Sequence, residues 1–256
     1  MQNISLVIIA LDEEHNIARC IRSVPFSKEV IVVDSGSKDK TKEIVESLGA
    51  KFIYNEWKSF GAQKKFATEQ ATCEWVLSLD ADEWLSEGLQ NEIKHFVGNN
   101  GFGYNVFKMK RMSRYLGRWI KHGGWYPDWQ TRLYKRELAN WSDDETIHET
   151  LKTKENVGKL WGLMYHMPFD GIKDQVDSNF RYAKLLAERK LKDGVRIYNP
   201  LKIVIKTLGR FFENYILKFG WMDGTAGFII AINSAQSYMV QLYTIYFESK
   251  KERKNV

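Results

Sequence analysis

Short apolar runs rich in Val, Ile and Leu alternate with stretches of helical spacing over the first hundred residues of the chain. Runs of about four to eight such residues between turn formers are typical of buried strands, and apolar residues three and four apart are typical of helices. The pattern predicts strands at residues 5–10, 29–34, 51–54 and 75–80. It predicts helices at residues 17–24, 40–48, 63–71 and 87–96, with three candidate caps: Ser37 or Asp39, and Ser86.

This alternating order predicts an α/β protein with a largely parallel sheet and helices on both faces. Ligands of such sheets bind outside the carboxyl ends of the strands, where loops and helix N-termini meet. Acidic residues follow three of the predicted strands and gather at that edge: Asp12, Glu13, Glu14, Asp34, Asp80 and Asp82. Their mutual repulsion requires a cation or hydrogen-bond donors, unless each residue only caps a helix or starts a turn.

Asp80 and Asp82 are the clearest sign of chemistry in this set. Carboxylates that leave a strand at alternate positions can share one divalent cation, and that cation can hold a diphosphate. A random chain of this length contains an Asp-x-Asp roughly 0.6 times, so the motif alone proves little. The pair gains weight from its place beyond the fourth predicted strand.

The regular alternation ends near residue 101. Residues 103–110 are predicted to add a strand, and residues 115–128 are rich in aromatic side chains. The aromatic segment has two interpretations. It is either a lid or acceptor platform, whose rings cover the apolar face of a sugar, or a satellite core beneath a long loop.

The chain from residue 172 onward is predicted to be helical. A helix that starts near Pro200 has apolar residues on one side and four cations beside them: Lys202, Lys206, Arg210 and Lys218. Such a helix fits an anionic membrane surface, and it also fits a helix packed on the rest of the protein with a solvated basic edge. Residues 224–247 contain too many amides and hydroxyls for a membrane span, which favours a buried, dimeric or membrane-surface helix before a frayed tail at 250–254.

Composition narrows the class of protein. A chain of 256 residues with 44% hydrophobic residues can bury a substantial core, as one large domain or a domain with an appendage. Cys20 and Cys73 are expected to be reduced, and the first ten residues are typical of a strand rather than a leader segment, so we expect a cytoplasmic protein. The net charge of +6 suits nucleic acid, an anionic membrane or an anionic substrate, but the cations are dispersed among acids and match no nucleic-acid-binding motif.

Four motifs in the first part of the chain together resemble a family 2 glycosyltransferase of the GT-A fold. They are Val7-Ile-Ile-Ala-Leu-Asp-Glu-Glu-His-Asn-Ile17, Val32-Val-Asp-Ser-Gly-Ser-Lys-Asp39, Gly61-Ala-Gln-Lys-Lys-Phe-Ala67 and Leu77-Ser-Leu-Asp-Ala-Asp-Glu83. Two later motifs narrow the resemblance to β-1,4-glucosyltransferases of the lipopolysaccharide or lipooligosaccharide core: His122-Gly-Gly-Trp-Tyr-Pro-Asp-Trp-Gln-Thr-Arg-Leu133 and Ile147-His-Glu149. The likeness is looser in the tail, which contains Gly220-Trp-Met-Asp-Gly-Thr-Ala-Gly-Phe228.

The resemblance implies a glycosyltransferase domain over residues 1–168, with a nucleotide-sugar half before about residue 100 and an acceptor half after it, and a helical extension over 169–256. It implies inverting, metal-dependent transfer of a hexose, with UDP-glucose as donor and a sugar hydroxyl of a lipid-linked glycan as acceptor. We expect a peripheral protein at the inner face of the bacterial inner membrane, whose C-terminal helices can also support an oligomer. The alternative is a non-catalytic scaffold of the same fold that binds nucleotide sugars or membrane.

By resemblance, five residues contact the nucleotide: Leu11, Glu13, Asp34, Lys64 and Asp80. Asp34 is implied to face the uracil edge, and Asp80 the ribose or the metal. Asp82 is the implied direct ligand of Mn²⁺ or Mg²⁺. His148 is a candidate further ligand, because neutral imidazole binds Mn²⁺; contact with Glu149 or with the acceptor is the alternative.

Inversion at the anomeric carbon needs one base on the face opposite the leaving group, to accept the proton of the acceptor hydroxyl. Asp128 is the candidate, since it lies where related enzymes carry their base and Pro127 restricts the backbone before it. Glu149 is the second candidate, and a plain turn is the other interpretation of residues 126–128. Three residues are expected to contact phosphate or acceptor groups: Gln130, Arg132 and Trp125.

Two positions depart from the family's pattern. Asp12 stands where the first motif commonly has Asn, and Lys65 stands where an Asn commonly follows the basic residue. Both lie in the nucleotide half of the chain. They therefore bear on the choice of donor rather than on the type of reaction.

Overall fold

The structure, a computed structural model, describes residues 3–142, 151–169 and 171–254. It contains two compact units, one formed by Met1–Met112 with Asp128–His166 and the other by Ser113–Pro127 with Met167–Val256. The aromatic segment after residue 112 is therefore grouped with the C-terminal helices. The division at residue 168 into two domains stays a prediction.

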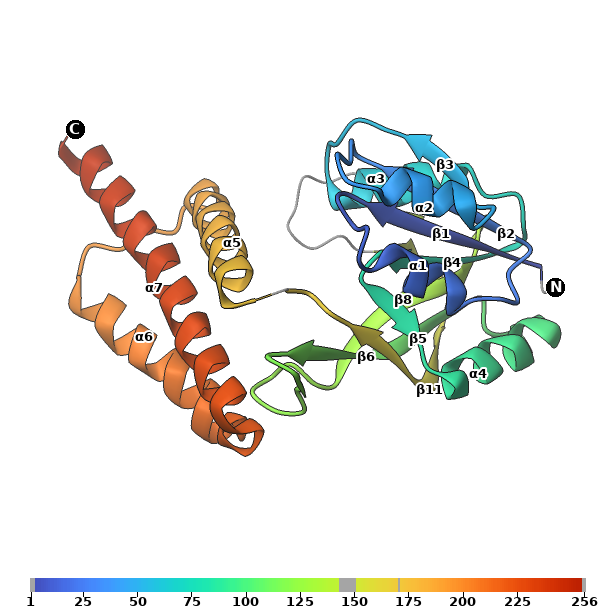
Figure 1. The fold of residues 1–256 in the computed structure, drawn as a ribbon. Coiled ribbons are helices and arrows are strands. Elements are labelled where there is room, and N and C mark those ends of the chain that lie inside the picture. Colours follow the sequence, from blue (N-terminus) through green and yellow to red (C-terminus); the bar gives the residue numbers. More distant parts are fainter. Residues whose placement is uncertain (1–2, 143–150, 170, 255–256) are drawn as a thin grey trace. The chain divides into compact units, whose positions relative to one another are not determined.

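The chain forms a nine-stranded mixed sheet, and all of its strands except β7 and the end of β6 belong to the first unit (Figure 1). Its strands are β1 (Ile4–Ala10), β2 (Glu29–Asp34), β3 (Lys51–Tyr54), β4 (Trp75–Asp80), β5 (Glu83–Leu85), β6 (Val106–Tyr115), β7 (Arg118–Trp119), β8 (Asp128–Lys135) and β11 (Val157–His166). The order is β3-β2-β1-β4-β8-β6-β11-β5, with β7 paired to β6. The first four strands in this order are parallel, whereas β8 is antiparallel to β4 and β6, and β11 is antiparallel to β5.

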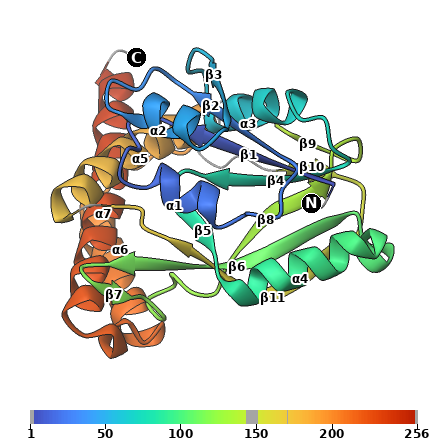
Figure 2. The ribbon, with the colours of Figure 1, turned by 45° about the vertical axis from the view of Figure 1, so that its right-hand side comes forward.

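Helices and a small second sheet cover both faces of this sheet (Figure 2). They are α1 (Ile17–Arg22), α2 (Thr41–Ser47), α3 (Phe60–Glu69), α4 (Glu87–Gly98), and the antiparallel pair β9 (Ala139–Trp141) and β10 (Leu151–Thr153). Helices α1, α2 and α4 pack over Leu6 and Ile8, while α3, β9 and β10 pack over Val7 and Ile9. Strand β1 is buried on both faces, which is why its sequence is a nearly continuous apolar run. The predicted class, an α/β protein with helices on both faces of the sheet and a helical C-terminal extension, is confirmed, and the sheet is mixed because β8 is antiparallel to β4.

The predicted strands of the first hundred residues agree closely with the structure. Strands β2, β3 and β4 have the predicted bounds, and β1 begins one residue earlier. Helix α3 begins at Phe60, before its predicted start, because Ser59 caps it by accepting the N–H of Ala62 at 3.1 Å. The strand predicted at 103–110 is shifted to Val106–Tyr115, since a short 3-10 turn with positive-φ glycines precedes it.

The predicted caps agree only in part. Ser86 caps α4 by accepting the N–H of Leu89 at 3.2 Å, as expected. The prediction for α2 is wrong, because its N-cap is Lys40, which makes no side-chain cap. Ser37 and Asp39 instead accept backbone N–H groups from the loop after β1. These hydrogen bonds tie the first two loops of the sheet edge together.

The helices of the second unit are α5 (Ile172–Lys192), α6 (Leu201–Phe212) and α7 (Gly224–Lys254), with α5 and α6 both packed on α7 (Figure 1). Their predicted starts at 172 and near Pro200 are confirmed. The prediction of a frayed tail is wrong, since α7 continues to Lys254. Within the described residues, no helix combines the length and the apolar character that a membrane crossing needs.

Two glycines let the chain close tightly between α6 and α7. A β-carbon on Gly227 would lie 1.9 Å from the carbonyl oxygen of Gly220, and one on Gly220 would lie 2.6 Å from that of Asn214. Only glycine permits such approaches. Buried Asp223 lies in the same turn and accepts the N–H of His122 at 2.7 Å. The turn before α7 therefore anchors the Gly-Gly loop that follows His122.

The aromatic segment forms a satellite core. Tyr115 and Ile120 are buried with Ala226 and Ile230 of α7. Trp125 is half-buried, and its ring centroid lies 5.8 Å from that of Tyr115. Of the two interpretations of this segment, the structure shows the packed one.

Candidate active site

Asp80 ends β4 and lies between two cations. Lys64 Nζ, from α3, is 2.9 Å from Asp80 Oδ1, and Arg132 Nη2, from β8, is 2.7 Å from Oδ2. Burial alone raises the pKa of Asp80, but the guanidinium of Arg132 and the ammonium of Lys64 outweigh burial and hold that pKa well below its usual range. The fold thus brings Lys64 and Asp80, which the resemblance assigns to the nucleotide, together with Arg132, which is expected to contact phosphate or acceptor groups.

Glu83, the first residue of β5, is the centre of this charge cluster. Its side chain is fully buried, and Oε1 accepts hydrogen bonds from Arg132 Nη2 at 2.8 Å and Arg111 Nη1 at 3.1 Å. Oε2 accepts the N–H of Asp80 at 3.1 Å. Sequence reasoning missed Glu83 and Arg111, because nothing local marks one acid beside Asp82 or one of several basic residues on β6 as buried.

Replacing Glu83 with alanine is expected to destabilise the protein by about 3 kcal/mol or more, because Arg111 and Arg132 lose a shared buried partner. Urea and thermal unfolding followed by circular dichroism measure this change. The matched control is Glu137→Ala, which removes an exposed carboxylate 3.9 Å from Arg136 and should alter stability by about 0.5 kcal/mol or less. Equal stability of the two variants would contradict the role given to Glu83.

Asp82 lies two residues beyond β4 and faces His166, the last residue of β11. Its Oδ2 is 3.2 Å from His166 Nε2, and its Oδ1 is buried without a hydrogen-bond partner in the described part of the chain. Burying such an oxygen costs free energy unless a cation or a water molecule binds to it. Carboxylate and imidazole are both ligands for Mn²⁺. The donor set fits a divalent ion. The described residues contain no group of three or more His, Cys, Asp or Glu side chains that could hold a metal, so a bound ion would also need nucleotide or water ligands.

His166 was missed by sequence reasoning. Antiparallel pairing sets His166 opposite Glu83, and this long-range register carries the imidazole to the aspartate pair. The available signal was a polar residue ending a strand in which Leu160 and Met164 are buried. The predicted candidates His148 and Glu149 lie outside the described residues and stay predictions.

Asp128 begins β8 and is held from two sides. Its Oδ2 accepts a hydrogen bond from Arg111 Nε at 2.8 Å, and its Oδ1 accepts one from Gln130 Nε2 at 2.7 Å. Burial lowers the pKa of Arg111, but the carboxylates of Glu83 and Asp128 outweigh burial and raise that pKa above its usual value. Arg111 therefore links the predicted base, through Glu83, to the aspartate pair.

The remaining acids shape the loops after β1 and β2. Asp34 accepts the backbone N–H groups of Gly36 and Ser37, each at 2.8 Å, and also the Ser37 hydroxyl. Asp12 has a φ of 54°, which Asn and Asp adopt more readily than most residues, and it accepts the N–H of Lys38 at 2.7 Å. Asp12 can thus replace the family's Asn without a change of backbone. The turn interpretation holds for Asp12 and Asp34, whereas Asp80 faces two cations.

The predicted nucleoside residues lie at one edge of the sheet. Leu11 is exposed directly after β1, and Glu13 follows it, with Oε2 accepting from Asn16 Nδ2 at 2.9 Å. Asp34 and Asp80 end β2 and β4, the two parallel neighbours of β1. The carboxyl ends of three adjacent strands therefore carry these residues together, as the sequence predicts.

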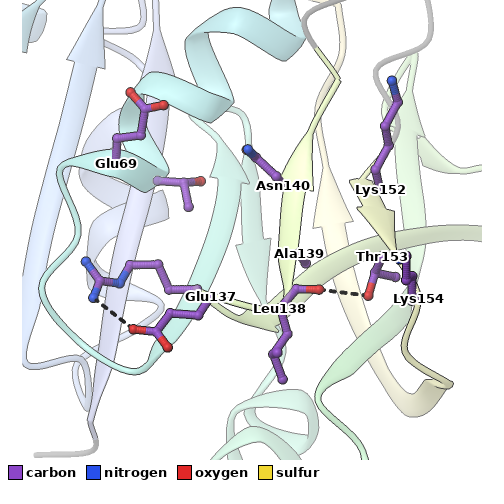
Figure 3. Close-up of a pocket in the computed structure, with 10 residues that line it drawn as sticks. Glu69, Glu137, Leu138, Ala139, Asn140, Lys152, Thr153 and Lys154 are labelled. Carbon is purple, nitrogen blue, oxygen red and sulfur yellow. Dashed lines mark hydrogen bonds and ion pairs between the residues drawn. The ribbon is translucent and has the colours of Figure 1, made fainter.

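A cavity of about 680 Å³ lies elsewhere in the first unit, beside β9 and β10 (Figure 3). In Figure 3 the carbonyl oxygen of Leu138 accepts the Thr153 hydroxyl, at 3.0 Å, beneath the side chains of Asn140 and Lys152. The lining residues are Thr68, Glu69, Arg136, Glu137, Leu138, Ala139, Asn140, Lys152, Thr153 and Lys154. None of the predicted site residues lines this cavity, so it is separate from the charge cluster.

One face of the sheet carries aromatic and basic side chains that are exposed or half-buried. These side chains are Lys108, Lys110, Trp129, Lys159 and Trp161. They point away from α4, because side chains alternate along a strand and the neighbouring residues Met109 and Leu160 lie in the core beneath that helix. The two indole rings meet edge to face at 5.7 Å, and the three ammonium groups lie 5.2–5.8 Å from a ring. Sequence reasoning missed this face, which exists only because β6 lies between β8 and β11. Ring faces beside cations suit sugars that carry negative charge.

Comparison with known proteins identifies the family. Residues 5–180 match the family described as Glycosyl transferase family 2. A protein of Rickettsia typhi, described as an uncharacterized glycosyltransferase, is 31% identical to this chain over 99% of the chain and 90% of the relative. The chain belongs to glycosyltransferase family 2.

This family 2 glycosyltransferase is also 28% identical to the lipopolysaccharide core biosynthesis glycosyltransferase LpsC of Rhizobium meliloti, over 99% of this chain and 96% of the relative. Among solved structures, residues 1–349 of S. aureus TarS in complex with UDP-GlcNAc cover 100% of this chain and 92% of that chain, at 15% identity and a TM-score of 0.49. The predicted family is confirmed. The narrower glucosyltransferase subgroup stays a prediction.

Proposed function

We propose that this family 2 glycosyltransferase moves glucose from UDP-glucose, with inversion and with Mn²⁺ or Mg²⁺, to a sugar hydroxyl of the lipopolysaccharide core or a similar lipid-linked glycan. The observation that carries the proposal is the aspartate pair beyond β4. Asp82 has a buried oxygen without a donor among the described residues, and Asp80 faces two cations. Similarity to LpsC supports the choice of acceptor, and a lipid-linked acceptor sets the reaction at the inner face of the membrane.

Asp82, Asp80 and His166 would hold the metal ion. When bound, the ion stabilises the negative charge that develops on the departing nucleoside diphosphate. Lys64 and Arg132 each hold one oxygen of the Asp80 carboxylate, which fixes the orientation of that carboxylate. The leaving group then needs no proton donor from the protein.

The nucleoside would lie against Leu11, Glu13 and Asp34. These residues follow the carboxyl ends of β1 and β2, beside the end of β4 that carries Asp80. Hydrogen bonds from Gly36 and Ser37 fix the Asp34 carboxylate, which holds the loop in one shape before the ligand arrives.

Asp128 would accept the proton of the attacking hydroxyl. Arg111 and Gln130 hold both of its carboxylate oxygens, and a base in a fixed orientation favours proton transfer along one line. Glu149 is the alternative base.

Acceptor contacts are assigned to residues next to Asp128 in the sequence. Gln130 follows it on β8. Arg132, also on β8, is buried against Asp80 and Glu83, and Trp125 belongs to the other compact unit, so acceptor contacts of these two residues stay predictions. The half-buried ring of Trp129 and the exposed ring of Trp161, with the lysines beside them, add a surface that suits sugar rings and anionic groups of the acceptor.

UDP-glucose is expected to raise the unfolding temperature only when Mn²⁺ or Mg²⁺ is present. A ligand that binds only the native state adds about 2.7 kcal/mol of stability at about one hundred times its Kd. Thermal unfolding with UDP-, GDP- and dTDP-sugars, each with metal and with EDTA, measures which nucleotide sugar the protein prefers and whether binding needs the metal. Full protection in EDTA would argue against the metal, and stronger protection by a GDP- or dTDP-sugar would argue against the donor.

Transfer itself is tested with radiolabelled UDP-glucose and membranes from cells that lack the gene for this protein, because those membranes keep the acceptor unmodified. Label should enter lipid-linked glycan only when the protein is added. A protein that binds the nucleotide sugar but transfers nothing to these membranes would instead be the non-catalytic scaffold.

A further inference from the structure

Helix α6 turns an apolar stripe outward. Its buried side rests on α7, where Ile203 joins Leu242 and Ile245 in a small core. On the other side, five large apolar side chains at helical spacing are each more than half exposed: Leu201, Val204, Ile205, Leu208 and Phe212. In the described residues, the most apolar side of this helix is thus the side that faces solvent.

Contacts on the packed side fix this orientation. The guanidinium of Arg210 lies 4.7 Å from the ring centroid of Tyr238, and Asn214 Nδ2 donates to Ser234 Oγ at 2.8 Å. Arg210 and Asn214 follow Ile203 at about two and three helical turns, roughly opposite the stripe. A rotation that hid the stripe would break these contacts with α7.

The exposed apolar surface continues through the turns after α6. Five further large apolar side chains there are 41–61% exposed: Ile216, Leu217, Phe219, Trp221 and Met222. We name these ten side chains, from Leu201 to Met222, the apolar edge. Exposed apolar groups gathered in one segment on this scale mark an interaction surface.

The segment that carries the apolar edge is basic. Residues 201–222 contain one carboxylate, Glu213, and four cations, Lys202, Lys206, Arg210 and Lys218. The net charge of this segment is therefore +3. Lys202 and Lys206 are exposed along one border of the stripe. Glu213 is already engaged by Lys218 at 2.6 Å and by Arg210 at 3.5 Å. The border therefore attracts anions.

We infer that the apolar edge lies in the surface of a membrane that contains anionic lipid. Apolar side chains on one side of a helix and cations along its border match a helix in the plane of the headgroups, with its cations among the lipid phosphates. Trp221, at the end of the edge, is a residue type favoured at that depth. Lipid binding of this kind needs neither the nucleotide nor the acceptor, so it goes beyond the proposed reaction.

A second copy of the chain fits the apolar edge less well than lipid does. Symmetric pairing would set one segment with a net charge of +3 against another. The single carboxylate of each segment is already paired with Lys218. An anionic leaflet complements the apolar groups and the charge together.

Flotation of the full-length protein with vesicles tests the inference. We expect binding to mixed phosphatidylcholine and phosphatidylglycerol vesicles to exceed binding to phosphatidylcholine alone by about tenfold or more, and to weaken in high salt. The double variant Ile205→Glu with Leu208→Glu should lose binding to the mixed vesicles by about tenfold or more, because two carboxylates then stand in the stripe.

The matched control is Leu185→Glu with Val195→Glu, which adds the same charges at exposed apolar positions of the same unit outside the apolar edge. It should bind vesicles nearly as wild type does. Protection by UDP-glucose checks each variant separately, since the nucleotide residues lie in the other unit. Failure of membrane binding and failure of the proposed reaction are therefore distinguishable.

Four outcomes would overturn the inference. They are no flotation of wild-type protein with mixed vesicles, equal recovery with neutral vesicles, equal loss in both double variants, and a dimer without vesicle binding that the Ile205→Glu and Leu208→Glu changes dissolve. The last outcome would assign the apolar edge to a second copy of the chain.

Discussion

Asp82→Ala should abolish sugar transfer and leave the protein at least as stable as wild type. The buried Oδ1 of Asp82 has no hydrogen-bond partner among the described residues, so its removal relieves a cost of folding that offsets the lost contact between Oδ2 and His166. In the proposed reaction the same oxygen binds the metal, and its loss should lower kcat/KM by about a thousandfold or more. Radiolabel transfer and thermal unfolding measure the two effects on one sample.

The matched control for Asp82→Ala is Glu14→Ala. Glu14 also follows a strand at the sheet edge, but its Oε2 accepts the backbone N–H of Lys40 at 3.1 Å, and it has no role in the proposed reaction. Glu14→Ala should keep transfer within about threefold of wild type. Substantial transfer by Asp82→Ala, or a loss of activity that follows a loss of stability, would remove Asp82 from the catalytic site.

Asp128→Asn should lower kcat by about a hundredfold to ten-thousandfold while the Kd for UDP stays near the wild-type value. Asparagine has the shape of aspartate and can still accept a hydrogen bond from Arg111, so the surrounding cluster is kept. It cannot take a proton from the acceptor hydroxyl. Single-turnover transfer measures the chemical step, and UDP protection in thermal unfolding measures binding.

Gln130→Ala is the control for Asp128→Asn. It removes the hydrogen bond to Asp128 Oδ1 but leaves the carboxylate, so transfer should fall by only about tenfold. Lost UDP binding in Asp128→Asn would mark Asp128 as part of the nucleotide pocket. Retained transfer would turn attention to Glu149, and Glu149→Gln would then be the variant to measure.

Local pattern was enough to predict the strands of the first hundred residues. Strands β2, β3 and β4 match their predicted bounds, because parallel strands buried on both faces are continuous apolar runs that end where polar turns begin. The same rule located Asp34 and Asp80 at the ends of β2 and β4, the two strands that flank β1. The need for positive partners beside these acids also followed from electrostatics, and Lys64 and Arg132 are those partners of Asp80.

Residues whose role depends on long-range pairing could not be predicted in this way. Glu83 is buried because Arg111 and Arg132, from β6 and β8, converge on it. His166 reaches Asp82 through the register of β11 on β5. Neither pairing has a local signal, since antiparallel order after residue 101 follows from the packing of the whole sheet.

The charge balance of the cluster links the metal to the nucleotide in the proposed reaction. The cluster contains four carboxylates, those of Asp80, Asp82, Glu83 and Asp128, and three cations, those of Lys64, Arg111 and Arg132. One negative charge is therefore uncompensated. A dianionic nucleotide alone would deepen this imbalance and a divalent ion alone would reverse its sign, whereas the two together leave it unchanged. Each ligand therefore strengthens the binding of the other, by the same factor in both directions.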